Sequence, residues 1–457
     1  MYRFRSIENL IGQYQELEKQ QIYFAARDEL NDPMEGKRRY FWKGDIIVWE
    51  NLLKHYLLCL EHVTFLARLI DENIVITKND IPIFKCEMHL PTEIYRERIQ
   101  NINERFFSDS FVQAYMQFIA KNPNKIYIEE LYVHLKVLTG RALNAIFTID
   151  IQSELIPNRE NTQFKREEKG QNIDLANVWD ELNEKSDSKT AYQELIECLH
   201  DVLKGWDNEL LLKYKDSPKL QSIHIEFPQM YLDSVVELTY PEGYVACFMD
   251  NCSNSSIWGT YGHNHTGVCL KFKTDSETSH VLPLKIITGY DYLDFELKPI
   301  EYSLDFDELD FFRNLGRLPI KQLREQWYTN ESGDLSICCE ELFSQVEEWR
   351  KQHWDVYEGA YFKKLPAWSH EREYRIILSS VLDTFEDPKN RVLEYKFENL
   401  EAIIFGMKTS KDDKMKIIEI VKRKCDELER KQFDFFEMAY SSSRNELYPR
   451  RILFWDK

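Results

Sequence analysis

The order of strand and helix signals along the chain constrains its fold more than any other feature. Strand-like stretches lie near both ends, whereas 44–235 carries apolar residues mainly at helical spacing. The clearest helical patterns span 46–69, 93–120, 126–147 and 195–213. We therefore expect an α+β core domain made of 1–43 and 236–457, with a large helical insertion at 44–235.

The core domain is expected to contain most of the strands. Their patterns span 1–5, 22–25, 244–249, 268–272, 281–287, 374–380, 392–397, 402–406, 433–439 and 451–455. Helices are expected at 321–351 and 411–430. Residues 158–189 are polar and charged, a composition typical of a connection or a loosely packed helix pair.

Net charge and cysteine content narrow the class of protein. The net charge is −19, which argues against a surface that grips nucleic acid all over, because phosphate binding relies on clustered Lys and Arg. The nine cysteines include no Cys-x-x-Cys pair, and the N-terminal residues show no secretion signal. These features predict a cytoplasmic protein with free thiols.

The most apolar helical stretch, 56–70, bears on membrane insertion. It is interrupted by Glu61, His62 and Arg68 and is shorter than the roughly 20 apolar residues of a membrane span. We therefore expect no membrane contact.

The segment 247–272 has the pattern strand, polar turn, short helix, glycine, strand. Gly267 is expected to end the helix in the left-handed conformation. Trp258, Tyr261 and His265 are three and four residues apart, so they are expected to share a helix face that forms one wall of a pocket. Alternatively, Trp258 and Tyr261 belong to the core and His265 lies at the surface.

A pair of carboxylates, Glu371 and Glu373, forms a second candidate site. If 371–378 is extended, alternation places Glu371, Glu373 and Arg375 on one strand face. Two neighbouring carboxylates perturb each other, which suits one to act as a base and the other to stabilise a cation. The alternative is a solvated ladder of ion pairs.

The first strand carries Arg3 and Arg5 on one face and is followed by Ser6, a helix-capping residue. Arginine suits bidentate phosphate contacts, and a helix start adds free amides, so this region forms a candidate anion site. Two solvated arginines on an edge strand are the alternative.

A turn at 31–36 follows the second strand. It is either a rigid connection or a loop that presents Asn31 or Asp32 to a ligand.

The segment 247–269 contains three cysteines and two histidines, residue types that bind structural zinc. Their spacing lacks the two-residue pairs of structural zinc sites, so we expect no metal there. The chain also contains no Gly-rich phosphate loop with lysine, no Gly-x-Ser-x-Gly and no His-Glu-x-x-His.

Taken in order, the four segments resemble a bacterial family catalogued as domain of unknown function 2971. The resemblance rests on Tyr-Arg-Phe-Arg-Ser, Asn-Asp-Pro-Met-Glu-Gly, Trp-Gly-Thr-Tyr with His-Thr-Gly-Val-Cys, and Trp-Ser-His-Glu-Arg-Glu-Tyr-Arg. Leu-Glu-Ala-Ile-Ile-Phe-Gly at 400–406 also fits the family ending. About 1–40 and 240–430 are covered, and the long helical stretch departs from the pattern.

The same layout is more distantly similar to ADP-ribosyltransferases, including DNA-modifying toxins. That resemblance implies a split, mixed β-sheet with a cleft for NAD as co-substrate. Arg5 or Arg3 would contact the NAD diphosphate or ribose. The other residues implied to contact NAD are Phe24, Asn31 and Asp32 in the early loop, and Trp258, Tyr261 and His265 near the nicotinamide.

The resemblance also implies catalytic roles for both carboxylates. Glu373 would bond the ribose 2′-hydroxyl and stabilise the oxocarbenium-like state, and Glu371 would orient or deprotonate the acceptor. The Ser-Thr-Ser strand of those enzymes has no counterpart beyond Ser253, Ser255 and Ser256.

The function expected from this resemblance is ADP-ribosyl transfer to a protein or nucleic acid, or hydrolysis of NAD, which would suit a bacterial toxin or phage-defence effector. The helical insertion would bind a protein partner. Two alternatives stay open: a non-catalytic module that binds a nucleotide or peptide, and a metal-dependent nuclease using Glu371, Glu373 and Asp32.

Overall fold

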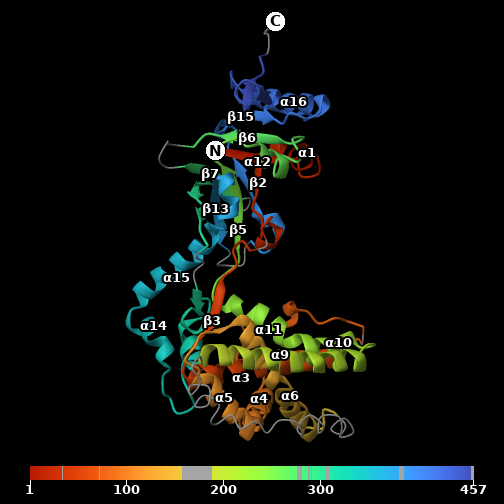
Figure 1. The fold of residues 1–457 in the computed structure, drawn as a ribbon, viewed down its shortest axis with the longest axis vertical. Coiled ribbons are helices and arrows are strands. Elements are labelled where there is room, and N and C mark those ends of the chain that lie inside the picture. Colours follow the sequence, from red (N-terminus) through yellow and green to blue (C-terminus); the bar gives the residue numbers. More distant parts are fainter. Residues whose placement is uncertain are drawn as a thin grey trace. The chain divides into compact units, whose positions relative to one another are not determined.

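The computed structural model describes residues 1–32, 34–71, 73–156, 188–274, 280–286, 289, 291–304, 308–379 and 385–453. The chain forms two compact units (Figure 1). The α+β unit comprises Met1–Lys37, Pro241–Asp307 and Val356–Lys457, and the helical unit comprises Arg38–Tyr240 and Glu308–Asp355. Helices and mixed sheets together make the chain an α+β protein, as expected.

The main sheet of the α+β unit has eight strands in the order β17-β16-β15-β6-β1-β5-β13-β9. β15 and β16 are parallel and the other neighbours are antiparallel, so the sheet is mixed. Its strands are β1 Tyr2–Arg5, β5 Gly243–Met249, β6 Val268–Phe272, β9 Lys298–Pro299, β13 Glu373–Ser379, β15 Leu400–Phe405, β16 Asp434–Ser441 and β17 Glu446–Arg451. β1 is therefore an interior strand.

A second, antiparallel sheet of four strands packs in the same unit. Its order is β2-β14-β7-β8, with β2 Gln21–Tyr23, β7 Val281–Ile286, β8 Tyr292–Glu296 and β14 Val392–Tyr395. Phe248 of the main sheet and Leu284 of the second belong to one buried apolar cluster, which we call the large core. Helix α16, Lys411–Glu427, adds Ile417 and Val421 to it.

Strand alternation gives the two faces of the main sheet different surroundings. Phe248 and Leu270 point into the large core. Phe4, Met249 and Trp258 form a smaller cluster, the small core, on the opposite face. Residues opposite each other in antiparallel strands share a face, so these partners identify which face any neighbouring side chain occupies.

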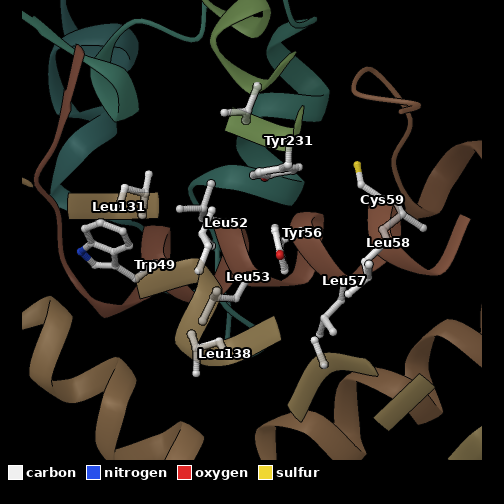
Figure 2. Close-up of a cluster of buried hydrophobic side chains, with 14 of the residues drawn as sticks. Trp49, Leu52, Leu53, Tyr56, Leu57, Leu58, Cys59, Leu131, Leu138 and Tyr231 are labelled. Carbon is white, nitrogen blue, oxygen red and sulfur yellow. The ribbon is translucent and has the colours of Figure 1, made fainter. Parts of the chain in front are cut away.

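The helical unit is built around α3, Ile46–Leu69, which begins at its cap Asp45. Figure 2 shows α3 side chains such as Leu52 and Tyr56 near Leu138 and Tyr231, all members of one buried cluster. Further helices of the unit among the described residues include α4 Glu93–Phe107, α5 Ser110–Ala120, α6 Ile128–Gln152, α9 Ser188–Lys213, α10 Pro218–Gln221, α11 Phe227–Val235, α13 Ile320–Gln322 and α14 Glu340–Ser344. A helix apolar on nearly all sides forms the centre of such a bundle.

The helical unit extends a few residues beyond the predicted insertion at each end, to Arg38–Tyr240, and it also takes in one distant segment. Glu308–Asp355, expected in the core domain, belongs to the helical unit because Phe311, Phe312 and Trp327 are buried in its core. Its strand β11, Glu308–Asp310, joins β3, Arg39–Trp42, in a small sheet that also includes β4 Ile126–Tyr127.

Several element boundaries also differ from expectation. The helix predicted at 93–120 is two helices, because Asp109 accepts hydrogen bonds from the amides of Phe111 and Val112 and caps α5. The region 321–351 contains several short helical turns before α15, Val346–Tyr361. The strand expected at 451–455 lies earlier, at β17. The predicted connection 158–189 lies almost wholly outside the described residues.

In the part of the chain that the structure describes, none of the helices combines the length and apolar character required to cross a membrane.

Gly406 allows a close backbone approach beside the main sheet. A Cβ atom at Gly406 would lie 2.2 Å from the carbonyl oxygen of His265. The amide of Gly406 also donates to the carbonyl oxygen of Gly267 at 3.0 Å, which holds the two loops together. Any side chain at Gly406 would force these loops apart.

We therefore expect Gly406→Ala to lower the free energy of unfolding by about 1–3 kcal/mol, the usual effect of overpacking. Gly259→Ala is the matched control, because no atom lies within 4 Å of a Cβ there and the residue is helical. It should leave stability unchanged or raise it by up to about 1 kcal/mol. Urea unfolding of both variants measures the difference, and equal stabilities would contradict the close approach.

Candidate functional site

Five charged side chains form a buried group in the α+β unit, which we call the carboxylate cluster. Its members are Glu35, Lys364, Glu371, Glu373 and Arg375, and each is at most 3% exposed. They come from three separate parts of the chain. Burial of this many charges is tolerated only with close pairing, so the arrangement is highly specific.

The strand β13 places two members of the cluster on a defined sheet face. Glu373 lies opposite Met249, and Arg375 lies opposite Cys247. Met249 belongs to the small core, so both charged side chains lie on that face. The intervening apolar residues of β13 point into the large core.

Glu371 reaches the cluster from a different element than the sequence predicted. The extended segment does not include Glu371, which ends the 3₁₀ helix η11, Pro366–Glu371. Arg372 then adopts a left-handed conformation with φ of 48°, and β13 begins at Glu373. The expected solvated ladder of ion pairs is also wrong, because Glu371 and Glu373 are buried.

Arg375 is the central cation of the cluster. Its Nε donates to Glu373 Oε1 at 2.7 Å and its Nη2 donates to Glu373 Oε2 at 3.0 Å, a bidentate pair. Nη1 donates to the carbonyl oxygen of Tyr361 at 2.8 Å. Arg375 also forms an ion pair with Glu35. The guanidinium therefore orients two carboxylates at once.

Lys364 connects all three carboxylates. It lies in β12, Lys363–Lys364, which pairs with β10, Glu301–Tyr302. The distances from its Nζ to carboxylate oxygens are 2.7 Å for Glu371, 3.1 Å for Glu373 and 3.4 Å for Glu35. The carboxylates are thus arranged around a single ammonium group.

Two phenols complete the hydrogen bonding of the cluster. The hydroxyl of Tyr261 donates to Glu371 Oε1 at 2.8 Å. The hydroxyl of Tyr302 accepts from the backbone amide of Glu373 at 2.9 Å. Tyr261 therefore links the 247–272 segment to the Glu-x-Glu segment, although the two are over 100 residues apart.

The surroundings of Glu373 and Glu35 shift the pKa values of these two carboxyl groups in opposite directions. Burial alone would raise the pKa of Glu373, but the charges of Arg375 and Lys364 outweigh it and lower this pKa from 4.5 to about 2. Burial raises the pKa of Glu35 despite the attraction of the same two cations. Glu373 is therefore held ionised, whereas Glu35 takes up a proton more readily than an exposed glutamate.

The helix of the 247–272 segment is shorter than predicted. α12 spans Ser255–Thr260, and the chain turns through three left-handed residues, His263, Asn264 and His265. Gly267 lies beyond this turn and does not end the helix. The expected single face of Trp258, Tyr261 and His265 therefore does not exist.

The three ring-bearing residues have different surroundings. Trp258 is fully buried in the small core, where its Nε1 donates to the carbonyl oxygen of Cys252 at 2.7 Å. His265 is half-buried and stacks on Trp258 with ring centroids 6.3 Å apart. Of the three, only Tyr261 reaches the carboxylate cluster. For Trp258 the alternative interpretation is correct, because this side chain belongs to the core.

The two N-terminal arginines lie on the other face of the main sheet. Arg3 and Arg5 are opposite Leu270 and Val268, which point into the large core. A ligand that contacts Glu373 would therefore be separated from both arginines by the sheet. The edge-strand alternative is wrong as well, because β1 is an interior strand.

Both arginines have internal partners. Arg3 donates to the carbonyl oxygens of Tyr23, at 2.8 Å, and Cys247, at 3.4 Å. Arg5 forms a bidentate ion pair with Glu16, in α2 Glu16–Lys19, and its Nε–Oε2 distance is 2.6 Å. Ser6 caps α1, Ile7–Ile11, as predicted. These contacts give the arginines structural roles.

The turn at 31–36 contributes Glu35, which the sequence reasoning missed. Phe24 is buried in the large core and Asn31 is exposed. Asp32 is buried, and its Oδ1 accepts from the amide of Met34 at 2.9 Å, so it shapes the turn. In the sequence, Glu35 could have been identified as a candidate site residue only from its position in this turn.

Lys364 was missed for a similar reason. It lies seven residues before Glu371, a spacing that brings two side chains together only if the intervening chain turns back. The compact η11 helix shortens the path between Lys364 and Glu371 enough for their side chains to meet.

The histidine, cysteine and acidic side chains bear on whether the protein holds a metal ion. In the described ranges, no three or more His, Cys, Asp or Glu side chains are placed to hold a metal ion. Cys269 is buried in β6 and packs in the small core as a small apolar residue. Cys247, in β5, lies beside the carboxylate cluster, where its thiol hydrogen-bonds Glu373 and helps to lower the pKa of that carboxyl group.

The pKa of Glu373 predicts how stability depends on pH. Its folded-state pKa lies below its ordinary value of 4.5, so its stabilisation is complete above pH 4.5 and is lost as pH falls toward 2. We expect Glu373→Gln to remove about 3 kcal/mol at neutral pH and to flatten the acid limb of the stability curve. Urea unfolding between pH 2 and pH 7 measures both effects.

The exposed residue Glu398 is the control for this experiment. Glu398→Gln should keep the wild-type acid limb. Glu35 has a raised pKa, so its contribution changes above its ordinary pKa and not in the acid limb. If the stability of Glu373→Gln fell between pH 4.5 and pH 2 as steeply as that of the wild type, the ion-pair geometry would be contradicted.

Comparison with known proteins gives one family match. No curated protein and no solved structure matches this chain. Residues 257–376 match the family described as "Protein of unknown function (DUF2971)". The matched stretch contains Tyr261, Lys364, Glu371, Glu373 and Arg375. The chain is therefore similar to this family over the segment that contributes most of the carboxylate cluster.

Proposed function

We propose that the α+β unit cleaves the bond between ribose and nicotinamide in NAD, as an ADP-ribosyltransferase or NAD glycohydrolase. The observation that carries this proposal is the pair of buried carboxylates, Glu371 and Glu373, whose oxygens lie 2.7 Å and 3.1 Å from the same Lys364 ammonium nitrogen. Two neighbouring carboxyl groups of this kind are characteristic of sites that break glycosidic bonds.

In the proposed reaction, Glu373 stabilises positive charge on the ribose. The bond from ribose C1′ to nicotinamide nitrogen breaks, and its electron pair leaves with nicotinamide. The remaining oxocarbenium-like cation is stabilised by the ionised Glu373 carboxylate, an effect worth several kcal/mol in a water-excluded site. The Lys364 ammonium, which now lies between Glu371 and Glu373, supports the idea that these carboxylates favour a cation.

Glu371 is the proposed base. It accepts the proton as the oxygen of water, or of an acceptor hydroxyl, forms the new bond to C1′. The hydrogen bond from Tyr261 orients Glu371 for this step. The carboxylates are buried, so substrate entry requires that Lys364 move away from them.

The proposal leaves out several residues implied by the family resemblance. Arg3, Arg5 and Phe24 are on the large-core face, and Trp258 is fully buried. Tyr261 and His265 remain candidates for contacts near the nicotinamide. A protein or nucleic acid would be the acceptor, and the activity would suit a bacterial toxin or phage-defence effector.

The central test is nicotinamide release from NAD by the purified protein, alone and with cell lysate. Glu373→Gln should lower the rate by at least about 100-fold, because an electrostatic interaction present in the transition state is lost. Glu398→Gln should retain full activity. Thermal melting shows whether each variant is folded at the assay temperature, and full activity of a folded Glu373→Gln would refute the mechanism.

Tyr261→Phe tests the orientation of Glu371. It keeps the ring and removes one hydrogen bond to a charged group, so we expect a fall in kcat of about tenfold. The affinity for NAD should change less, which separates a role in positioning from a role in binding. If Tyr302→Phe lowered kcat about tenfold while Tyr261→Phe stayed fully active, the positioning role would belong to Tyr302 and not to Tyr261.

A second candidate function is a non-catalytic module that binds a nucleotide or peptide. It is favoured by the internal pairing of Glu371 and Glu373 with Lys364 and Arg375, which is also typical of a structural ion network. Binding of NAD in calorimetry without nicotinamide release would support it. The nuclease alternative has less support, because no three or more His, Cys, Asp or Glu side chains of the described residues are placed to hold a metal ion.

A further inference from the structure

The helical unit contains a cavity of about 700 Å³, separate from the carboxylate cluster. It is lined by residues of α3 and α4, by residues 86–87 and by the segment 325–331, all within the helical unit. This volume lies within the range of pockets that bind small molecules, roughly 300–1,000 Å³.

The lining of the cavity is strongly acidic. Its charged residues are Glu50, Glu87, Glu104, Glu325, Glu331 and one cation, Lys54. The Nζ of Lys54 pairs with Glu50 at 2.9 Å and with Glu331 at 3.0 Å. In the described part of the chain, no cation is paired with Glu87, Glu104 or Glu325. The cavity therefore has a surplus of negative charge.

A buried amide in the lining positions one of these glutamates. Asn103 is 8% exposed, and its Nδ2 donates to Glu87 Oε1 at 3.2 Å. Glu87 is therefore held at the wall of the cavity by a neutral donor, which leaves its negative charge uncompensated.

Aromatic rings add a second attraction for cations. Phe107 and Trp327 both line the cavity, and the ammonium of Lys54 lies 5.9 Å from the centroid of the Phe107 ring. The negative face of an aromatic ring attracts ammonium and guanidinium groups at such distances. Lys54 thus shows how the cavity accommodates an organic cation.

We propose that this cavity binds an organic cation through its ammonium or guanidinium group. The free glutamates supply the charge, and the rings pack against the aliphatic part. Such a group belongs either to a small polyamine or to a basic side chain of a peptide. The site is independent of the proposed NAD chemistry, because its residues lie in the other unit.

Calorimetry with spermidine, argininamide and an arginine-containing pentapeptide tests this proposal on the full-length protein. The double variant Glu104→Gln/Glu325→Gln should weaken binding of the preferred probe by at least about tenfold, because each change removes a charge-assisted contact. Both residues are exposed, so folding should be retained. The preferred probe identifies the source of the cation, small molecule or peptide.

The matched control is Glu97→Gln/Glu209→Gln, which changes the net charge equally at exposed positions outside the cavity. It should bind as the wild type does. Equal weakening in both double variants, or equally tight binding of Mg²⁺ alone, would reveal a general acidic field and overturn the proposal. Failure of all three organic probes to bind at millimolar concentration would overturn it as well.

Discussion

The ion pair between Arg375 and Glu373 is the interaction on which the candidate site depends. Removing one partner of a buried pair typically costs about 3–5 kcal/mol, because the other charge is left uncompensated. Here the pair also orients Glu35 and, through Lys364, Glu371. Loss of one charge would therefore change the protonation and the position of the remaining carboxyl groups together.

The main sheet separates two kinds of environment. One face builds the large core, in which Arg3 and Arg5 have internal partners. The other face carries the small core and the carboxylate cluster. The strand alternation that buries apolar residues on one side thus places charged residues of β13 on the other, which confines the candidate chemistry to a single face.

Much of the secondary structure was predictable from apolar spacing and capping residues. The helix at 46–69 was predicted at its observed bounds because its apolar residues follow helical spacing, and the structure shows that Asp45 caps it. The break at Asp109 and the short turns of 321–351 were not, because local capping competes with a continuing helical pattern. Segment 308–355 was misassigned because its buried aromatic residues show no preference for one core over another.

The sequence by itself determined that strands flank a helical stretch and that Glu371, Glu373 and Tyr261 are candidate site residues. Both follow from local properties, the spacing of apolar residues and the chemistry of single side chains. Only the tertiary structure decided that these side chains meet Glu35 and Lys364 and that Arg3 and Arg5 do not. The face on which a side chain lies depends on strand pairing. The pKa of a carboxyl group depends on cations brought from distant segments, and neither can be read from the order of residues alone.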